Sequence, residues 1–315
     1  MSLWVLNQLH DLNRGYTAEM TLFGAPVDQA AFNQHIDDFC ASYPGMRRGM
    51  EPYRDLVGRA VDGYISPVWR YDGSSVGRWT STPNMVSLLS RIPEIRNAFP
   101  ELGIVCARQM ELYLFVKMAG EPELIEAYEA GHNLNDVVAQ ELGIPRIVAR
   151  RLNFGVVCGS SEVTVAEAAR EPLEYIAGLL QRHRARYPRL EEYTRRMENE
   201  GKTRGGATTP ILGTRVNLSR SAPRMMAGKL TFATVSDLMK IAFCTLWSKS
   251  AALVSTVGPT RVHMITPDEL FVFKRVLPEA RELVRTVWAD EGYQFCMDNP
   301  IVRKTAWERL LEDDD

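Results

Sequence analysis

The sequence lacks several features that would assign it to a class directly. Its five cysteines are widely scattered and include no C-x-x-C pair, so we expect neither a disulfide framework nor a zinc site, and a reducing cytoplasm as the compartment. The first residues have neither a basic start nor a long apolar core, so no secretory signal is expected. No uninterrupted apolar run reaches the roughly 18–20 residues of a membrane helix, so no membrane partner is expected.

Net charge is small as well. The 315 residues carry a formal charge of −2, which argues against a protein that coats nucleic acid without specificity. The charges are unevenly distributed, because 8 Lys/Arg stand against 4 Asp/Glu between Arg182 and Arg204. This basic segment fits either a phosphate-binding face or an exposed helix of mixed charge. Composition leaves both interpretations open.

The chain shows no internal repeat and no long Pro/Gly/Ser linker between independent domains. Helical patterns are predicted over 27–60 with a break at Pro44–Gly45, and over 111–118, 122–130, 145–157, 164–200, 229–247 and 278–291. Strands are predicted at 104–106, 261–265 and 270–273, together with a hairpin around Gly213. This mixture predicts an α+β fold with a small antiparallel sheet and many helices.

Four segments carry motifs in order between residues 62 and 273. The first runs from Asp62-Gly63-Tyr64 to Val76-Gly77-Arg78-Trp79-Thr80-Ser81-Thr82-Pro83-Asn84. The second is I-V-C-A-R-Q-M-E-L over 104–112, followed by Ala119-Gly120-Glu121. The third is R-I-V-A-R-R-L-N-F-G-V-V-C-G over 146–159, and the fourth joins A-T-V-S-D-L-M-K over 233–240 with T-P-D-E-L over 266–270. Together these motifs resemble those of family A (DNA polymerase I type) DNA polymerases.

The resemblance implies a polymerase core with a palm, built on a small antiparallel sheet with helices, and helical fingers. It implies a helical N-terminal segment over 1–61 as a thumb remnant. Palm segments are expected over 62–137 and 236–315, and fingers over 138–235. Because about 60 residues precede the first motif, we expect the thumb to be reduced or absent and no exonuclease domain to be present.

The resemblance also implies a catalytic pair, Asp268 and Glu269, for phosphoryl transfer assisted by two metal ions. Cys106 stands where the family has its other catalytic aspartate, and Mg²⁺ prefers hard oxygen ligands to sulfur. Binding of Mg²⁺ or Mn²⁺, with Asp268 as the metal ligand, is therefore expected to be weak or absent. Taken without the resemblance, Cys106 is a small buried strand residue, and Asp268 and Glu269 are turn residues.

Arg146, Arg150 and Phe154 recur every four residues and therefore share one helix face. The resemblance implies that this face binds an incoming nucleotide, with Gln109 and Glu111 as further nucleotide-binding residues and Glu111 as the sensor of the sugar. Without it, the same face is a solvated basic surface with Phe154 in the core, and Glu111 is an acid favoured by the helix dipole.

The first motif implies that Arg78 contacts the primer–template, with Asn84 at a second matching place. Asp237 is expected to tie a palm helix and to have no part in catalysis. Further departures from the family pattern concentrate around the same predicted pocket: Ala107, Asn135, Cys158 and Pro267.

These observations favour a degenerate polymerase that acts in replication, in a phage or mobile element, with catalysis lost or strongly reduced. Its expected partner is primer–template DNA or single-stranded nucleic acid, and other replication proteins are further candidates. One alternative is an active minimal polymerase that takes a metal ligand from elsewhere, such as Glu111 or Glu269. Another is a protein-interaction or virion-assembly module that retains only the fold.

Overall fold

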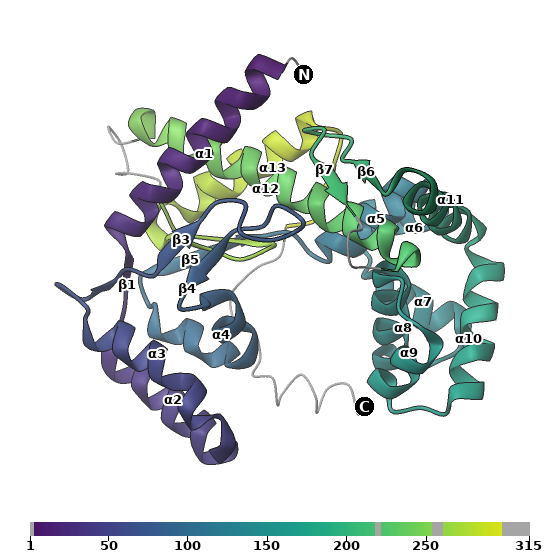
Figure 1. Cartoon of the computed structure of the whole chain (residues 1–315), viewed down its shortest axis with the longest axis horizontal. Helices are drawn as coiled ribbons and strands as arrows, with labels where there is room; N and C mark the ends of the chain where they lie inside the picture. Colours follow the sequence, from purple (N-terminus) through teal and green to yellow (C-terminus); the bar gives the residue numbers. More distant parts are fainter. Residues whose placement is uncertain (1–2, 218–221, 254–260, 298–315) are drawn as a thin grey trace. The chain divides into compact units, whose positions relative to one another are not determined.

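In a computed structural model the chain folds as two compact units (Figure 1). Unit 1 comprises residues 1–106, 239–290 and 297–315, and unit 2 comprises residues 107–238 and 291–296. The structure describes residues 3–217, 222–253 and 261–297. Small antiparallel sheets stand among many helices, so the predicted α+β class is confirmed. The palm, fingers and thumb boundaries expected above remain predictions.

The centre of unit 1 is an antiparallel sheet of β5 (Leu102–Cys106), β9 (Glu269–Phe273) and β8 (Val262–Ile265), in the order β5–β9–β8. Nearly all of their side chains are buried, as in sheets covered on both faces. Helix α13 (Leu277–Asp290) packs on β5, and a Cβ at Gly103 would lie only 2.7 Å from Leu277 Cδ2. The predicted strand at 104–106 and the strand–turn–strand at 261–273 are confirmed.

Helices and short strands complete unit 1: α1 (Leu3–Phe23), β1 (Ala25–Pro26), α2 (Gln29–Ser42), α3 (Arg47–Gly58), β2 (Tyr64–Ile65), β3 (Val68–Arg70), β4 (Thr80–Thr82) and α4 (Met85–Arg91). Helices α2 and α3 lie side by side in Figure 1, separated by the 3₁₀ turn Pro44–Met46. The break predicted at Pro44–Gly45 is therefore confirmed. Further 3₁₀ turns span Pro93–Ala98 and Lys274–Val276.

The loop between β3 and β4 is anchored to two helices of unit 1. The indole Nε1 of Trp79 donates a hydrogen bond of 2.9 Å to Thr17 Oγ1 on α1. The fully buried Lys240, on the long helix α12 (Met226–Leu253), places its Nζ 2.7 Å from Asp72 Oδ1. These contacts fix the loop that carries Arg78.

Unit 2 is mainly helical: α5 (Met110–Ala119), α6 (Pro122–Glu129), α7 (Leu134–Leu142), α8 (Arg146–Cys158), α9 (Glu162–Ala169), α10 (Leu173–Arg186) and α11 (Pro188–Arg204). The helical pattern predicted over 164–200 is in fact three helices. Breaks occur before Pro172 and Pro188, because a proline cannot donate the backbone hydrogen bond that would continue the preceding helix. Helix α11 also runs past Gly201 and ends at Arg204, where Gly205, with a φ of +65°, caps it.

Strands β6 (Gly206–Thr208) and β7 (Arg215–Asn217) form the hairpin predicted around Gly213. Asp237 of α12 is fully buried and holds the loop of this hairpin. Its carboxylate accepts hydrogen bonds from Thr209 Oγ1, from Thr214 Oγ1 at 2.8 Å and from Leu212 N at 3.3 Å. The tying role expected for Asp237 is thus borne out by its contacts.

The 3₁₀ turn Pro223–Met225 leads into α12. Among the described residues, the stretch Pro223–Ser248 is long and apolar enough on average to cross a membrane, although it contains no long uninterrupted apolar run. Of its apolar window, 83% is buried within the protein, as in the core helix of a globular fold.

Candidate functional site

The predicted catalytic residues of unit 1 meet where β5 ends and β9 begins. Cys106 and Glu269 are direct partners in the antiparallel register, so their side chains share one face of the sheet. Asp268 lies in the turn just before β9, which the hydrogen bond from Thr266 N to Glu269 O (2.9 Å) closes. The structure therefore places Cys106 opposite Glu269, and Asp268 immediately precedes Glu269 in the chain; a catalytic role for these residues remains a prediction.

Glu269 is held by protein groups. Its side chain is 1% exposed, and Oε2 lies 2.9 Å from Arg96 Nη2. The same guanidinium donates to Leu89 O at 2.7 Å, and Thr266 Oγ1 lies 3.3 Å from Glu269 Oε2. The charge of Glu269 is thus compensated by an arginine from the 3₁₀ turn Pro93–Ala98.

These residues do not fit a magnesium centre. A divalent ion at this edge would find the half-buried Asp268 carboxylate, a carboxylate at Glu269 already bound to Arg96, and the sulfur of Cys106, which is 2% exposed. Mg²⁺ requires several oxygen ligands in near-octahedral geometry. Among the described residues, no group of three or more His, Cys, Asp or Glu side chains is placed to hold a metal ion.

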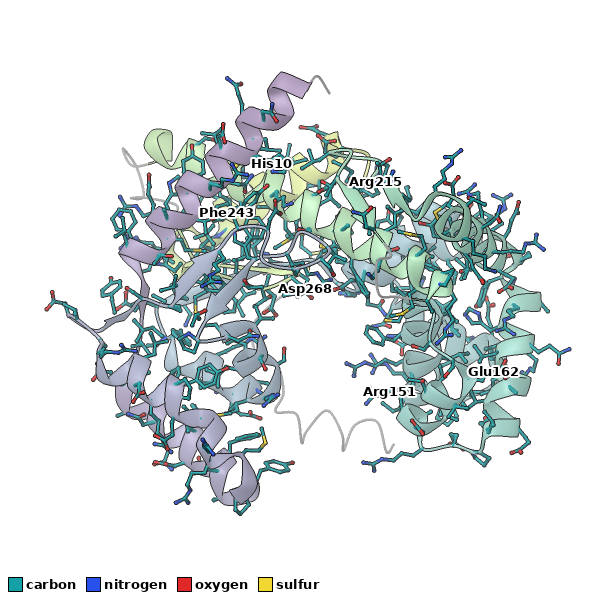
Figure 2. The ribbon with its side chains drawn as sticks, viewed as in Figure 1. His10, Arg151, Glu162, Arg215, Phe243 and Asp268 are labelled. Carbon is teal, nitrogen blue, oxygen red and sulfur yellow. The ribbon has the colours of Figure 1, made fainter. Side chains whose placement is uncertain are left out.

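Unit 2 contains a pocket of about 330 Å³ between α5, α7 and α8. Four of the predicted nucleotide-binding residues line it: Gln109, Glu111, Arg150 and Phe154. Further lining residues that the motifs did not indicate as ligands are Leu112, Asn135, Arg151, Asn153 and Val157. Arg151 projects away from α8 in Figure 2 and is exposed.

Gln109 combines a left-handed backbone with a buried side-chain donor. It precedes α5 in the left-handed region (φ +49°, ψ +41°), a conformation that is costly for a residue with a side chain and is often found at functional sites. Its Oε1 accepts a hydrogen bond from Leu134 N at 2.9 Å. Its Nε2 is buried and has no hydrogen-bond partner among the described residues. Because a buried donor without a partner is costly, a ligand acceptor in this pocket would satisfy it.

Comparison with known proteins decides the family. The family model "DNA polymerase family A" matches residues 41–285, more than half of the sequence. The chain belongs to DNA polymerase family A. It is 26% identical over 248 residues to the thermostable DNA polymerase I of Thermus thermophilus, covering 68% of this chain and 29% of that protein. It is 24% identical over 280 residues to DNA polymerase I of Mycobacterium tuberculosis (strain ATCC 25618 / H37Rv), covering 79% and 30%.

A solved structure supports the same fold. The polymerase domain of Pol1 from M. smegmatis, in complex with a DNA primer–template and dNTP, superposes with a TM-score of 0.71 at 17% identity. The match covers 90% of this chain and 67% of that one. The chain spans about 30% of the length of the two curated relatives named above.

In this family A chain, the third motif forms all of α8, and three of its residues lie on the exposed face of that helix. Arg146, Arg150 and Phe154 are all exposed, and Phe154 keeps 61% of its surface accessible. The alternative in which Phe154 lies in the core is therefore wrong. Arg146 does not line the pocket, and its Nε is bound to Asp136 Oδ1. Arg146 therefore does not share the pocket with Arg150 and Phe154.

The two predicted DNA-binding residues lie in unit 1. Arg78 is half-buried in the loop between β3 and β4, and its backbone N donates to Ser74 Oγ at 2.9 Å. Asn84 caps α4, because its Oδ1 accepts a hydrogen bond from Ser87 N at 3.0 Å. Asn84 therefore has a local structural role, and DNA contact by either residue remains a prediction.

Four of the eight basic residues in the segment 182–204 form ion pairs. Arg184 lies 3.7 Å from Glu162 and 3.5 Å from Glu191, and Arg186 contacts Glu123 and Glu141. Lys202 and Arg204 form ion pairs with glutamates one turn earlier. These pairs favour the interpretation of an exposed face with mixed charge.

A larger hollow, of about 710 Å³, lies in unit 1 between the end of α1 and strands β2 to β4. It is lined by exposed apolar residues such as Leu22 and by Arg59 and Arg261. None of the site residues predicted from the sequence lines it.

Proposed function

We propose that this family A protein binds nucleotide and nucleic acid in a replication-related role and has lost most or all nucleotidyl transfer. One observation carries the proposal: Cys106 stands directly opposite Glu269 in the sheet, and Glu269 is bound to Arg96. Two-metal catalysis of phosphoryl transfer depends on carboxylates that hold two ions about 3.5–4 Å apart. Asp268 is the remaining candidate metal ligand, so Mg²⁺ or Mn²⁺ would be held weakly.

Nucleotide binding is supported by the pocket of unit 2. Arg150 and Arg151 offer guanidinium groups that suit phosphate oxygens, and the exposed ring of Phe154 offers a surface on which a base can stack. Glu111 is the carboxylate among the described lining residues and would face the sugar. The buried Nε2 of Gln109 adds a donor for a ligand oxygen.

Primer extension tests the loss of catalysis. The purified protein is incubated with a primer–template and all four dNTPs, with Mg²⁺ or with Mn²⁺, beside the variant Asp268→Ala. We expect no extension above that of the variant. Robust extension that Asp268→Ala abolishes would refute the proposal and support the alternative of an active polymerase with altered metal ligands.

Binding assays test what is retained. We expect dTTP to bind, and Arg150→Ala to raise its Kd by about 10-fold, because a charge-assisted hydrogen bond contributes roughly 1.5–3 kcal/mol. Arg195→Ala, at an exposed position on α11, is the matched control and should leave the Kd unchanged. Primer–template binding should weaken as salt rises. A folded protein that binds neither ligand would support the interaction module instead.

A further inference from the structure

Three buried polar side chains form a hydrogen-bonded chain that begins at the pocket of unit 2. Asn153 Nδ2 on α8 donates to Asn135 Oδ1 on α7 at 2.9 Å. Asn153 Oδ1 lies 3.3 Å from His183 Nε2 on α10. Asn135, Asn153 and His183 are 9%, 4% and 2% exposed, and the first two line the pocket whereas His183 does not. These three side chains therefore connect the wall of the pocket to α10.

The orientation of the Asn153 amide in the structure sets the direction of both hydrogen bonds. Since Asn153 uses its amide nitrogen toward Asn135, its oxygen is the atom that faces His183, and His183 must donate from Nε2. Burial, with a smaller effect of Arg184, lowers the pKa of His183 to about 4, so the ring is neutral near pH 7. Its one ring proton is therefore held on Nε2.

These hydrogen bonds determine which atom of the Asn135 side chain is available to a ligand. Its side-chain oxygen is occupied by Asn153, so the amide nitrogen is the part of this side chain that remains for a ligand in the pocket. Gln109 repeats the arrangement, since its oxygen is occupied by Leu134 N and its nitrogen is buried without a partner among the described residues. The two amides flank Leu134 at the start of α7 and add uncharged donors to the guanidinium groups of Arg150 and Arg151.

We propose that Asn135 binds an acceptor oxygen of the nucleotide, and that Asn153 and His183 are positioning residues that aim its amide nitrogen at that oxygen. This inference rests on the proposed nucleotide-binding function of the same pocket. A rigid carboxamide loses no rotational freedom on binding, and the alternative orientation of Asn135 would place its amide nitrogen against the amide nitrogen of Asn153. His183 therefore affects the ligand without touching it.

A purely structural role for these three hydrogen-bonded side chains makes a different prediction. Buried amides in a helical unit need partners in any case, and removing one lowers stability whatever the pocket does. Only the positioning role predicts that a change at His183 alters ligand affinity through Asn135. A double-mutant cycle on the Kd, and not on stability, separates the two.

The experiment measures the Kd of dTTP by calorimetry at pH 7.5 for wild type, Asn135→Ala, His183→Phe and the double variant. His183→Phe keeps the ring that packs edge-on against Tyr187 but removes the donor. Asn135→Ala should raise the Kd by about 10-fold, in line with a hydrogen bond to a charged group. His183→Phe should raise it about 3- to 10-fold in the wild-type background and not at all beside Asn135→Ala.

Two controls accompany the cycle. His183→Gln retains an amide donor and should keep the Kd within about twofold of wild type. Leu180→Ala, at a buried position one turn earlier on α10, should lower Tm and leave the Kd unchanged. If His183→Phe does not fold, Asn153→Leu, which is close in volume, takes its place with the same expected result.

The outcomes are distinguishable. If Arg150→Ala weakens dTTP binding but His183→Phe leaves the Kd unchanged, or raises it equally beside Asn135→Ala, the positioning role is wrong and the proposed function stands. If the folded wild type does not bind dTTP, the inference is overturned together with the nucleotide-binding part of the proposed function. A Kd that rises only where Asn135 is present supports the inference.

Discussion

Replacing Cys106 by aspartate would reintroduce a second carboxylate at the edge of the unit 1 sheet. Cys106 faces Glu269 directly in the antiparallel register, and Asp268 immediately precedes Glu269 in the chain. In the present protein the acidic charge of Glu269 is offset by Arg96. The variant Cys106→Asp adds a negative charge on the same face without adding a cation, so we expect it to unfold more easily unless a divalent ion binds.

The strand register gives the size of the destabilisation expected for Cys106→Asp. Directly opposed residues in an antiparallel pair have Cα atoms about 4.5–5.5 Å apart, so the carboxylates would lie roughly 5 Å from each other. At an effective dielectric constant of about 20, two like charges at that distance repel by about 3 kcal/mol. Arg96 reduces this repulsion only in part, because it is already bound to Glu269 and to Leu89 O. We therefore expect a loss of about 2–3 kcal/mol in the free energy of unfolding with EDTA.

The assay is urea unfolding of wild type, Cys106→Asp and Cys106→Ser with EDTA, with Mg²⁺ and with Mn²⁺. The aspartate variant should recover most of its loss in the presence of a metal, since a ligand at 100 times its Kd stabilises the folded state by about 2.7 kcal/mol. Wild type and Cys106→Ser should differ by less than about 0.5 kcal/mol between EDTA and metal. A wild type that gains as much from Mn²⁺ as the aspartate variant would show that the existing residues already form a metal site.

Three further changes test other parts of the structure. Burial lowers the pKa of His183 to about 4, from about 6.5 in unfolded chains, and so keeps the ring neutral. The contribution of the neutral ring to the free energy of unfolding is therefore complete above pH 6.5 and is lost as the pH falls toward 4. Wild type should lose up to about 3 kcal/mol relative to His183→Gln over that range in urea titrations, and parallel curves would refute this. Asp237→Ala should cost about 2–4 kcal/mol by removing a buried acceptor of several hydrogen bonds, and an unchanged urea midpoint would contradict it. Gly228→Ala should lower Tm by several degrees, because its Cβ would lie 2.3 Å from Val157 O, whereas Gly178→Ala, which has open space, should not.

Much of the fold could be predicted because the signals are local. Two apolar runs flank the turn residues Thr266, Pro267 and Asp268, and they form the two strands that the pattern predicts. The strand predicted at 104–106 starts two residues earlier in the structure. The sequence did not predict this extension because glycine, here Gly103, is a poor strand residue. Its position in the strand is explained by the close approach of Leu277, which no local pattern reports.

The site could be predicted in part. Four residues predicted from the motifs line one pocket: Gln109, Glu111, Arg150 and Phe154. Two of them lie on α8, one on α5 and one just before α5. Arg151 had a local signal as well, because it precedes Phe154 by three residues and so lies beside it on the helix surface.

Other members of the site had no such signal. The partnership of Asn153 with His183 joins residues 30 positions apart on different helices. Helical periodicity identifies His183 only as a residue on the buried face of α10, and nothing in its neighbours indicates a hydrogen bond to the pocket wall.

The distribution of retained and lost residues at the sheet edge has a physical explanation. Glu269 anchors the guanidinium of Arg96, and removing the glutamate would leave that half-buried cation without this partner, which destabilises the fold. Asp268 sits half-buried in a tight turn, where aspartate is favoured whatever the catalytic state. At the position of Cys106, a small apolar side chain fills a buried strand position at least as well as a charged one. Under the proposed loss of catalysis, no bound metal would favour an aspartate at this position, so this is the member of the set that can be replaced without destabilising the sheet.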